Sequence, residues 1–313
     1  MKEYVFGIDV GGTTVKFGLF KNEELLEKWA IPTDTSNRGE NLIKDISCSL
    51  KEKMNSHALS ADDIKGAGIG IPGAVHDGYL EPCVNLGGFG GAGIEEAFKG
   101  ECGFPFKLLN DANAAGLGEM RKGSAHGYEN IYFITLGTGV GGCLILNKKL
   151  IAGAHGCCGE IGHMNMNAEE KRSFGLKKPG CLEMYASATG IVLNAEDLLK
   201  ESDKPSALRD HGSFTCADVF DLAKKGDELS LETVELMARY LGRAMASIAC
   251  VCNPDIFVIG GGVCAAGDFL IKKVEKYFKE YAFASSVNTK ISLAVLGNDA
   301  GIWGGLEMAQ SVF

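Results

Sequence analysis

Short apolar runs that stop at glycine or acidic residues recur along this chain. The first run, Tyr4–Val10, carries Asp9 close to its end, and Gly11 and Gly12 separate it from a second run, Thr14–Phe20. Bulky β-branched and aromatic residues are typical of strands, whereas adjacent glycines are typical of tight turns. The pattern therefore predicts a β-hairpin with glycines and one carboxylate at its tip.

The same layout occurs again later in the chain. A run over Ile131–Leu136 meets Gly137, Thr138 and Gly139 and continues over Val140–Leu146. A repeated supersecondary pattern is typical of internal duplication. We therefore predict an α/β fold with two lobes that share one plan.

The rest of the chain alternates between strand-like and helix-like periods. Further strands are expected at 25–31, 67–71, 106–109, 255–259 and 291–296, and helices at 39–57, 111–120, 182–199, 215–224, 228–252, 263–279 and 300–309. Residues 72–93 lack a clear period and are expected to form a long functional loop. This order predicts a partly parallel sheet in each lobe, with ligands at the carboxyl ends of the strands.

The length of 313 residues is that of about two domains. We expect a small lobe at residues 1–118, to which a helix at about 298–313 returns, and a large lobe at 119–297. No low-complexity linker separates them.

Charge and cysteine content restrict the partners. A net charge of −9 disfavours a nucleic-acid-binding surface, and the apolar runs are too short to cross a membrane, so neither partner is expected. The first residues show no pattern of a secretory signal, so none is expected, and the chain has eleven cysteines, an odd number. We therefore expect free thiols in the reducing cytoplasm.

The glycine clusters are candidate phosphate sites. Backbone N–H groups of small residues can converge on phosphate oxygens, and the Asp9 carboxylate suits Mg²⁺ held through water. Two facing hairpins could hold a nucleotide's phosphates, and a triple glycine after a strand could let the backbone approach its adenosine. The absence of a G-x-x-x-x-G-K-[ST] motif excludes a P-loop enzyme. The candidate nucleotide residues are Asp9, Gly11, Gly12, Thr13, Thr14, Gly137, Thr138, Gly139, Gly260, Gly261 and Gly262.

Asp111 is the candidate acid–base residue, because it follows a strand at the start of a helix, beside Asn110. The alternative interpretation is a helix cap without a chemical role. Glu160 and His163 lie three residues apart in a glycine-rich segment, and Glu183 begins a helix. Carboxylates and amides suit the vicinal hydroxyls of a sugar; His163 is either a sugar ligand or a packed histidine.

Six ordered segments resemble the ROK family of bacterial sugar kinases and repressors, within which the glucokinases are most similar. The segments are GIDVGGTTVKFGLF, GIGIPGAV, LNDANAAGLGE, TLGTGVGGCLIL, GEIGHM and GCLE. The resemblance implies the two-lobed actin-like fold of sugar kinases and heat-shock ATPases, with a cleft between the lobes, and a homodimer. It implies that Asp111 is the catalytic base. The sugar ligands that it implies are Gly73, Asn85, Asn110, Asp111, Glu160, His163 and Glu183.

The family usually binds a structural zinc through the histidine of its G-H pair and three cysteines. Here His163 and Cys181 remain, whereas Phe174 and Leu176 stand at two of the cysteine positions. Two ligands cannot complete a tetrahedral site unless Cys157 or Cys158 supplies more. We therefore expect no structural zinc and an apolar plug of Phe174 and Leu176 in its place.

The resemblance implies transfer of the γ-phosphoryl group of ATP to the 6-hydroxyl of glucose, with Mg²⁺ bound. A kinase for another sugar, such as N-acetylmannosamine, fructose or allose, stays open, as does a sugar-binding protein that has lost catalysis. A repressor would need a preceding DNA-binding segment, and a filament or chaperone ATPase would not need the sugar motifs.

Overall fold

The computed structural model describes residues 2–173 and 178–313. The chain forms two compact units. The first unit contains Met1–Gly127, Cys143–Cys158 and Leu296–Phe313, and the second contains Tyr128–Gly142 and Gly159–Val295.

The first unit is built on a five-stranded sheet in the order β3-β2-β1-β4-β8. Its strands are β1 (Tyr4–Val10), β2 (Thr14–Lys21), β3 (Glu24–Pro32), β4 (Ile64–Ile71) and β8 (Phe106–Asn110). β1 and β2 are antiparallel, as the hairpin pattern predicts, whereas β1, β4 and β8 run parallel. Asp9 pairs with Gly70, and Ile71 pairs with Asn110. The carboxyl ends of these three strands therefore meet at one edge of the sheet.

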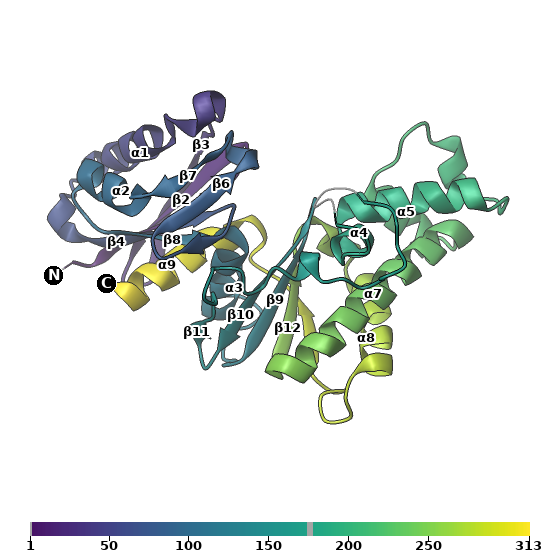
Figure 1. Cartoon of the computed structure of the whole chain (residues 1–313). Coiled ribbons are helices and arrows are strands. Elements are labelled where there is room, and N and C mark those ends of the chain that lie inside the picture. The colour runs from purple at the N-terminus through teal and green to yellow at the C-terminus, as the bar shows by residue number, and fades with distance from the viewer. Residues whose placement is uncertain (1, 174–177) are drawn as a thin grey trace. The chain divides into compact units, whose positions relative to one another are not determined.

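Helices cover both faces of this sheet (Figure 1). They are α1 (Leu42–Ser56) and α2 (Ile94–Cys102) on one face and α3 (Asp111–Arg121) and α9 (Ala300–Val312) on the other. α1 buries Leu42, Ile46 and Leu50 at a spacing of four residues, which is the period of one helix face. Leu306 of α9 packs with Phe20 of β2 on the opposite side.

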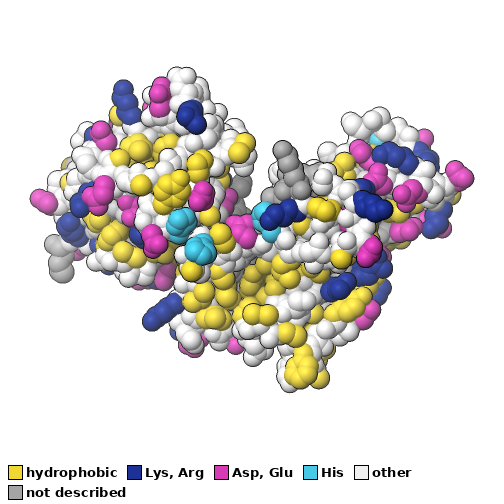
Figure 2. Space-filling model, in the orientation of Figure 1, with side chains coloured by type: hydrophobic (Ala, Val, Ile, Leu, Met, Phe, Trp, Pro, Cys, Tyr) yellow, Lys and Arg dark blue, Asp and Glu magenta, His cyan; other side chains and the backbone are white. Residues whose placement is uncertain are grey.

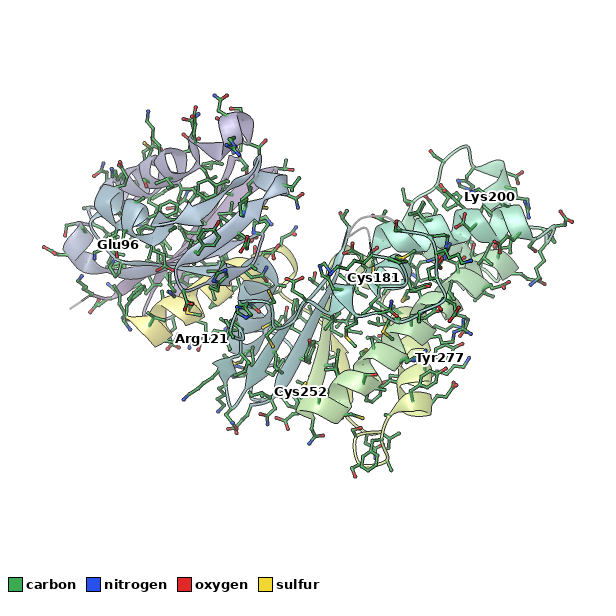
Figure 3. All side chains as sticks on the ribbon, in the orientation of Figure 1. Glu96, Arg121, Cys181, Lys200, Cys252 and Tyr277 are labelled. Carbon is green, nitrogen blue, oxygen red and sulfur yellow. The ribbon has the colours of Figure 1, made fainter. Side chains whose placement is uncertain are left out.

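α9 is also joined to α3 by charge. Arg121 lies at the end of α3 (Figure 3). It donates through Nη1 to Glu307 and through Nη2 to Gln310, both at 2.8 Å. These contacts attach the C-terminal helix to the helix that begins with Asp111.

The prediction of an irregular loop over residues 72–93 is wrong. This segment forms a small antiparallel sheet, β5-β6-β7, with β5 (Val75–His76), β6 (Tyr79–Cys83) and β7 (Phe89–Ala92). Pro82, Gly90 and Gly91 interrupt the strand pattern, so these short strands have no visible period. The sequence analysis also did not predict the helix α2.

The second sheet has the order β11-β10-β9-β12-β13. Its strands are β9 (Ile131–Leu136), β10 (Val140–Leu146), β11 (Lys149–Leu150), β12 (Ile256–Gly260) and β13 (Lys290–Leu293). β9, β12 and β13 are parallel, and β10 and β11 are antiparallel. Both sheets thus consist of a hairpin extended by one antiparallel strand on one side and two parallel strands on the other. The expected repeat is confirmed at the level of strand order.

The helices of the second unit are α4 (Glu183–Ala186), α5 (Ala188–Glu201), α6 (Cys216–Lys224), α7 (Glu228–Cys252) and α8 (Asp268–Tyr281). The single helix predicted over 182–199 is wrong, because Ser187 has an extended backbone and its hydroxyl caps α5 by accepting the N–H of Gly190. After Gly262 the chain forms a 3₁₀ turn before α8 begins, later than predicted.

Charged side chains of both signs are interspersed on the face that Figure 2 shows. In the part of the chain that the structure describes, no helix has the length and apolar character needed to span a membrane.

Candidate active site

Thr33 forms two hydrogen bonds with the first glycine hairpin. Its hydroxyl donates to the carbonyl of Gly11 at 2.7 Å, and its N–H donates to the carbonyl of Thr13 at 2.9 Å. Within the tip, the N–H of Gly11 donates to the carbonyl of Thr14 at 2.9 Å. Residues 12–14 are exposed. The predicted phosphate residues of this hairpin therefore form one ordered turn.

Asp9 lies directly behind this turn. Its Oδ2 is 3.4 Å from Nζ of Lys16, and 22 % of its side chain is exposed. Burial raises the pKa of Asp9, and the Lys16 charge opposes this rise. A partly exposed carboxylate offers the oxygen ligands that Mg²⁺ prefers, so Asp9 could take the predicted metal role.

Asn110 connects the start of α3 to the turn after β4. Its Oδ1 accepts the N–H groups of Ala112 and Asn113 at 3.0 and 3.2 Å, and its Nδ2 donates to the carbonyl of Gly73 at 3.1 Å. Asn110 is thus the helix cap that the conservative interpretation expected. It also brings Gly73 to the predicted base.

Asp111 is exposed at the first position of α3. Its Oδ1 accepts from Nδ2 of Asn110 at 3.0 Å and from the N–H of Ala112 at 2.8 Å. These two donors orient the carboxylate. An oriented, accessible carboxylate at the carboxyl edge of a parallel sheet is placed to accept a proton from a bound hydroxyl.

Asn85 lies against the first hairpin. A Cβ built on Gly12 would be 3.0 Å from the carbonyl oxygen of Asn85 and 3.8 Å from its Cβ. The structure therefore brings Asn85, Gly73, Asn110 and Asp111 together with the hairpin in the first unit.

Glu160 and His163 lie in the second unit, around a 3₁₀ turn at Ile161–His163. Nε2 of His163 is 4.0 Å from Oε2 of Glu160, and both side chains are more than one-third exposed. This exposure favours a ligand role for His163 over that of a packed core histidine.

A short ladder joins the segment after His163 to the segment before Glu183. The N–H of Leu182 donates to the carbonyl of Met164 at 2.9 Å, and Asn165 and Cys181 form an antiparallel bridge. The two sugar motifs of this unit are therefore neighbours in space as well as in sequence order.

An ion cluster holds the connection between these motifs. Arg172 pairs with Glu170 at 2.6 Å and with Asp197 of α5 at 2.5 Å. The hydrogen bonds from Arg172 lower the pKa of Glu170 to about 2, and the hydroxyl of Tyr185 also donates to Glu170 at 3.1 Å. The sequence analysis missed this cluster, since Tyr185 follows Glu170 by 15 residues, Asp197 follows Arg172 by 25, and no local pattern links them.

Cys181 lies in a buried cluster of the second unit. It is 1 % exposed and packs with Met184 and Tyr185; Figure 3 marks its position. Within residues 2–173 and 178–313, no group of three His, Cys, Asp or Glu side chains could hold a metal ion. The expected absence of a structural zinc stays a prediction. The predicted plug of Phe174 and Leu176 lies outside the described residues.

The second hairpin is fastened to the junction of α4 and α5. The N–H of Ala188 donates to the carbonyl of Gly137 at 2.8 Å, and Oγ1 of Thr189 donates to the carbonyl of Thr138 at 3.1 Å. Oε2 of Glu183 accepts the N–H of Val140 at 3.0 Å. The contact between Glu183 and the hairpin was not expected from the sequence.

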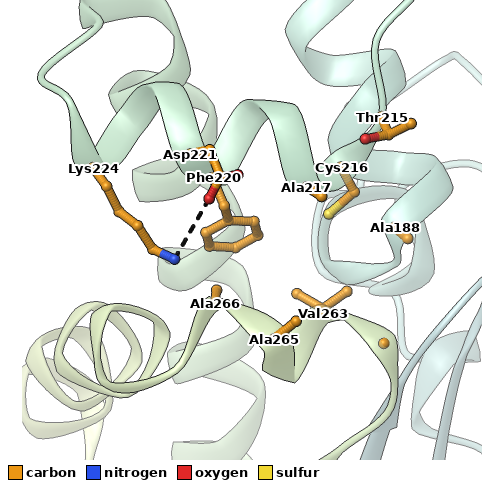
Figure 4. Close-up of a pocket in the computed structure, with 11 residues that line it drawn as sticks. Ala188, Thr215, Cys216, Ala217, Phe220, Asp221, Lys224, Val263, Ala265 and Ala266 are labelled. Atoms are coloured by element: carbon orange, nitrogen blue, oxygen red, sulfur yellow. Dashed lines mark ion pairs between the residues drawn. The ribbon is translucent and has the colours of Figure 1, made fainter.

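A cavity of about 430 Å³ adjoins this hairpin (Figure 4). Its lining residues are Ala188, Thr215, Cys216, Ala217, Phe220, Asp221, Lys224, Gly262, Val263, Ala265 and Ala266. An ion pair between Lys224 and Asp221, at 3.7 Å, lies on its wall. Ala188 both lines the cavity and binds the hairpin, so the two features are continuous.

The triple glycine contributes unequally to this cavity. Gly262 lines it, whereas Gly260 ends β12. Gly261 has a φ of +87°, and a Cβ there would be 2.3 Å from the carbonyl oxygen of Leu136, so only glycine fits. The turn therefore brings the backbone of Gly262 to the cavity at the end of the strand that leads into the hairpin.

The sequence profile of the ROK family matches residues 5–312. This chain belongs to the ROK family. The predicted resemblance is confirmed over nearly the whole chain. The matching strand order of the two sheets agrees with the actin-like fold of ROK sugar kinases, so the predicted fold class is also confirmed.

The chain is 39 % identical over 306 residues to a glucokinase of Halalkalibacterium halodurans, covering 96 % of this chain and 92 % of that one. It is 28 % identical to an N-acetylmannosamine kinase of Haemophilus influenzae, covering 97 % and 95 %. A glucokinase of Streptomyces griseus, solved with glucose and AMPPNP, matches with a TM-score of 0.75 and 26 % identity, covering 98 % and 99 %. This ROK protein is therefore a carbohydrate kinase.

Proposed function

We propose that this ROK kinase transfers the γ-phosphoryl group of ATP to the 6-hydroxyl of glucose. The observation that supports this proposal most directly is the exposed carboxylate of Asp111, which is oriented by Asn110 and by the N–H of Ala112 at the start of α3. The 39 % identity to a glucokinase supports glucose as the sugar.

In this mechanism, Asp111 accepts the proton of the 6-hydroxyl as the sugar oxygen attacks the γ-phosphorus. The new oxygen–phosphorus bond forms while the bond to the β-phosphate bridging oxygen breaks, which leaves ADP. Phosphoryl transfer depends mainly on positioning and on charge stabilisation. Gly73, Asn85 and Asn110 of the first unit and Glu160, His163 and Glu183 of the second would hold the sugar hydroxyls.

The nucleotide assignment rests on the hairpins and the cavity. Residues Gly11–Thr14 and Gly137–Gly139 would bind phosphate oxygens, and the cavity beside Gly262 has the size and mainly apolar lining expected for an adenosine. Bound Mg²⁺ would neutralise phosphate charge, and Asp9 would hold it.

Three further expectations from the sequence concern the cleft, the oligomeric state and the cellular role of the protein. A cleft between a small lobe (residues 1–118 and 298–313) and a large lobe (119–297), a homodimer, and a cytoplasmic role in glycolysis stay predictions. Sedimentation of the purified protein would test the dimer.

A panel of sugars tests the substrate. ADP release should be greatest with glucose when glucose, fructose, allose and N-acetylmannosamine are compared at equal concentrations. Activity confined to N-acetylmannosamine would contradict glucose as the substrate and would leave the proposed kinase activity intact. Absence of ADP release with every sugar, despite sugar binding, would favour a binding protein.

The Asp111→Asn variant tests the base. Asparagine keeps an oxygen that accepts the N–H of Ala112, so the fold should persist, whereas loss of a general base lowers kcat by about 10²–10⁴-fold. Glucose binding, measured by calorimetry, should stay within a few-fold. The control is Glu96→Gln, an exposed carboxylate in the first turn of α2, which should keep full activity. An Asp111→Asn enzyme with unchanged kcat would contradict the assignment.

A further inference from the structure

Glu183 has a contact that a sugar ligand does not need. It is the first residue of α4 and is 9 % exposed, and its Oε2 accepts the backbone N–H of Val140 at 3.0 Å. Val140 directly follows the hairpin Gly137–Gly139. A buried carboxylate of the sugar motif is thus bonded to the backbone of the second phosphate hairpin.

Gly139 makes room for this carboxylate. A Cβ built on Gly139 would be 2.4 Å from Oε2 of Glu183 and 4.0 Å from its Oε1. Oε2 therefore packs directly on the hairpin backbone. Oε1 lies farther from the hairpin and can serve a second partner.

The backbone of Glu183 is itself anchored. Its carbonyl accepts the hydroxyl of Ser187 at 2.7 Å, and the same stretch of chain binds the hairpin through Ala188 and Thr189. The segment from Glu183 to Thr189 thus holds the hairpin at three points. Two of them engage carbonyls of the tip, and Glu183 alone engages an N–H.

We infer that Glu183 is a positioning residue, which sets the second phosphate hairpin through the Val140 N–H in addition to its proposed sugar role. Phosphate binding by backbone N–H groups requires those groups to converge, and a free Val140 N–H would allow the hairpin to adopt other conformations. This inference rests on the proposed kinase function. It implies that removing Glu183 weakens nucleotide binding even without sugar.

The first test is ADP affinity measured by calorimetry in the absence of sugar. Glu183→Ala removes the acceptor, and we expect ADP to bind roughly tenfold more weakly, the size of a lost buried hydrogen bond. Glu183→Gln keeps one acceptor oxygen and should bind ADP within about twofold of the unchanged enzyme. Rescue by glutamine separates positioning from general loss of structure.

Glu160→Ala is the matched control, since Glu160 belongs to the same proposed sugar set and faces His163. It should raise the KM for sugar and leave ADP affinity unchanged. If Glu183→Ala behaves like Glu160→Ala, with sugar affinity lost and ADP affinity retained, the inference is overturned.

Hydrogen exchange distinguishes this inference from the proposed function. The Val140 amide should exchange faster in Glu183→Ala than in Glu183→Gln, with no ligand present and whatever reaction the enzyme catalyses. Retained protection of this amide in Glu183→Ala would also overturn the inference. Failure to phosphorylate any sugar would instead contradict the kinase proposal and leave the exchange result standing.

Discussion

The two glycine hairpins have similar sequences and are supported in different ways. The first has an acid within its own strand, Asp9, which pairs with Lys16 of the returning strand. The second obtains its acid from Glu183, 43 residues beyond the Val140 N–H that it accepts. The two similar sequences therefore form similar backbone hairpins. The acidic side chain beside each hairpin comes from a different part of the chain.

This difference suggests different tasks. Asp9 is partly exposed and is placed to meet a cation, whereas the Oε2 atom of Glu183 is occupied by the backbone. We expect the first acid to act on the reacting phosphates and the second to act on hairpin geometry.

Among the changes that compare the two hairpins, the largest expected effect follows from replacing the acid of the first hairpin. Asp9→Asn removes the charge proposed to hold Mg²⁺ and leaves Lys16 without its partner, so kcat should fall by about 10²–10³-fold, as for loss of a key electrostatic contact. Initial rates at saturating glucose and Mg²⁺-ATP measure it. The comparison variant is Glu183→Gln, whose kcat should fall much less. Equal losses would mean that the two acids have equivalent roles.

A smaller effect should follow from adding one methyl group to each hairpin. Gly139→Ala places a Cβ against Oε2 of Glu183 and displaces this oxygen from the Val140 N–H, whereas the Cβ of Gly12→Ala meets the backbone carbonyl of Asn85 at 3.0 Å. Overpacking typically costs about 1–3 kcal/mol, so Gly139→Ala should raise the KM for ATP roughly tenfold. Gly12→Ala should raise the KM for ATP less and should also raise the KM for sugar, because the added methyl group meets Asn85. A larger increase of the KM for ATP in Gly12→Ala than in Gly139→Ala would contradict the proposed importance of the contact between Glu183 and the second hairpin.

The smallest effect concerns stability in the second unit. The pKa of Glu170 is about 2 in the folded protein, against an ordinary value of 4.5. A lowered pKa stabilises the fold above about pH 4.5, and this stabilisation is lost as the pH falls towards 2. Arg172→Gln removes the cause, so the variant should unfold more easily than the unchanged protein at neutral pH, with the difference shrinking below pH 4.5.

Urea unfolding across this pH range measures the difference. Lys200→Gln is the control, because Lys200 pairs with Asp197 on the exposed surface of α5 and such pairs contribute about 0–1 kcal/mol. A difference for Arg172→Gln that does not change with pH would contradict the role of Glu170.

Much of the fold could be predicted because its signals are local. Both hairpins follow from apolar runs broken by small turn residues, and α1 follows from Leu42, Ile46 and Leu50 at a helical spacing. Asn110 and Asp111 were also recognisable, since a helix cap depends on adjacent residues.

The errors lie where local signals were weak. β6 and β7 contain Pro82, Gly90 and Gly91, which hide a strand period. The apolar pattern from 182 to 199 continues across Ser187, although the extended backbone there separates α4 from α5. Pairing among neighbouring strands decided the outcome in the first place, and contacts of Ala188 and Thr189 with the distant second hairpin accompany the break in the second.

The sequence by itself determined the family, the repeated α/β plan and the residue types of the candidate site, because these depend on neighbouring residues and on motif order. Only the tertiary structure decided that Glu183 reaches Val140, that Arg172 joins Glu170 to Asp197, and that the cavity adjoins the second hairpin. The contacts of Glu183 with Val140 and of Arg172 with Asp197 join residues 43 and 25 positions apart. Their geometry depends on packing, which no local pattern encodes.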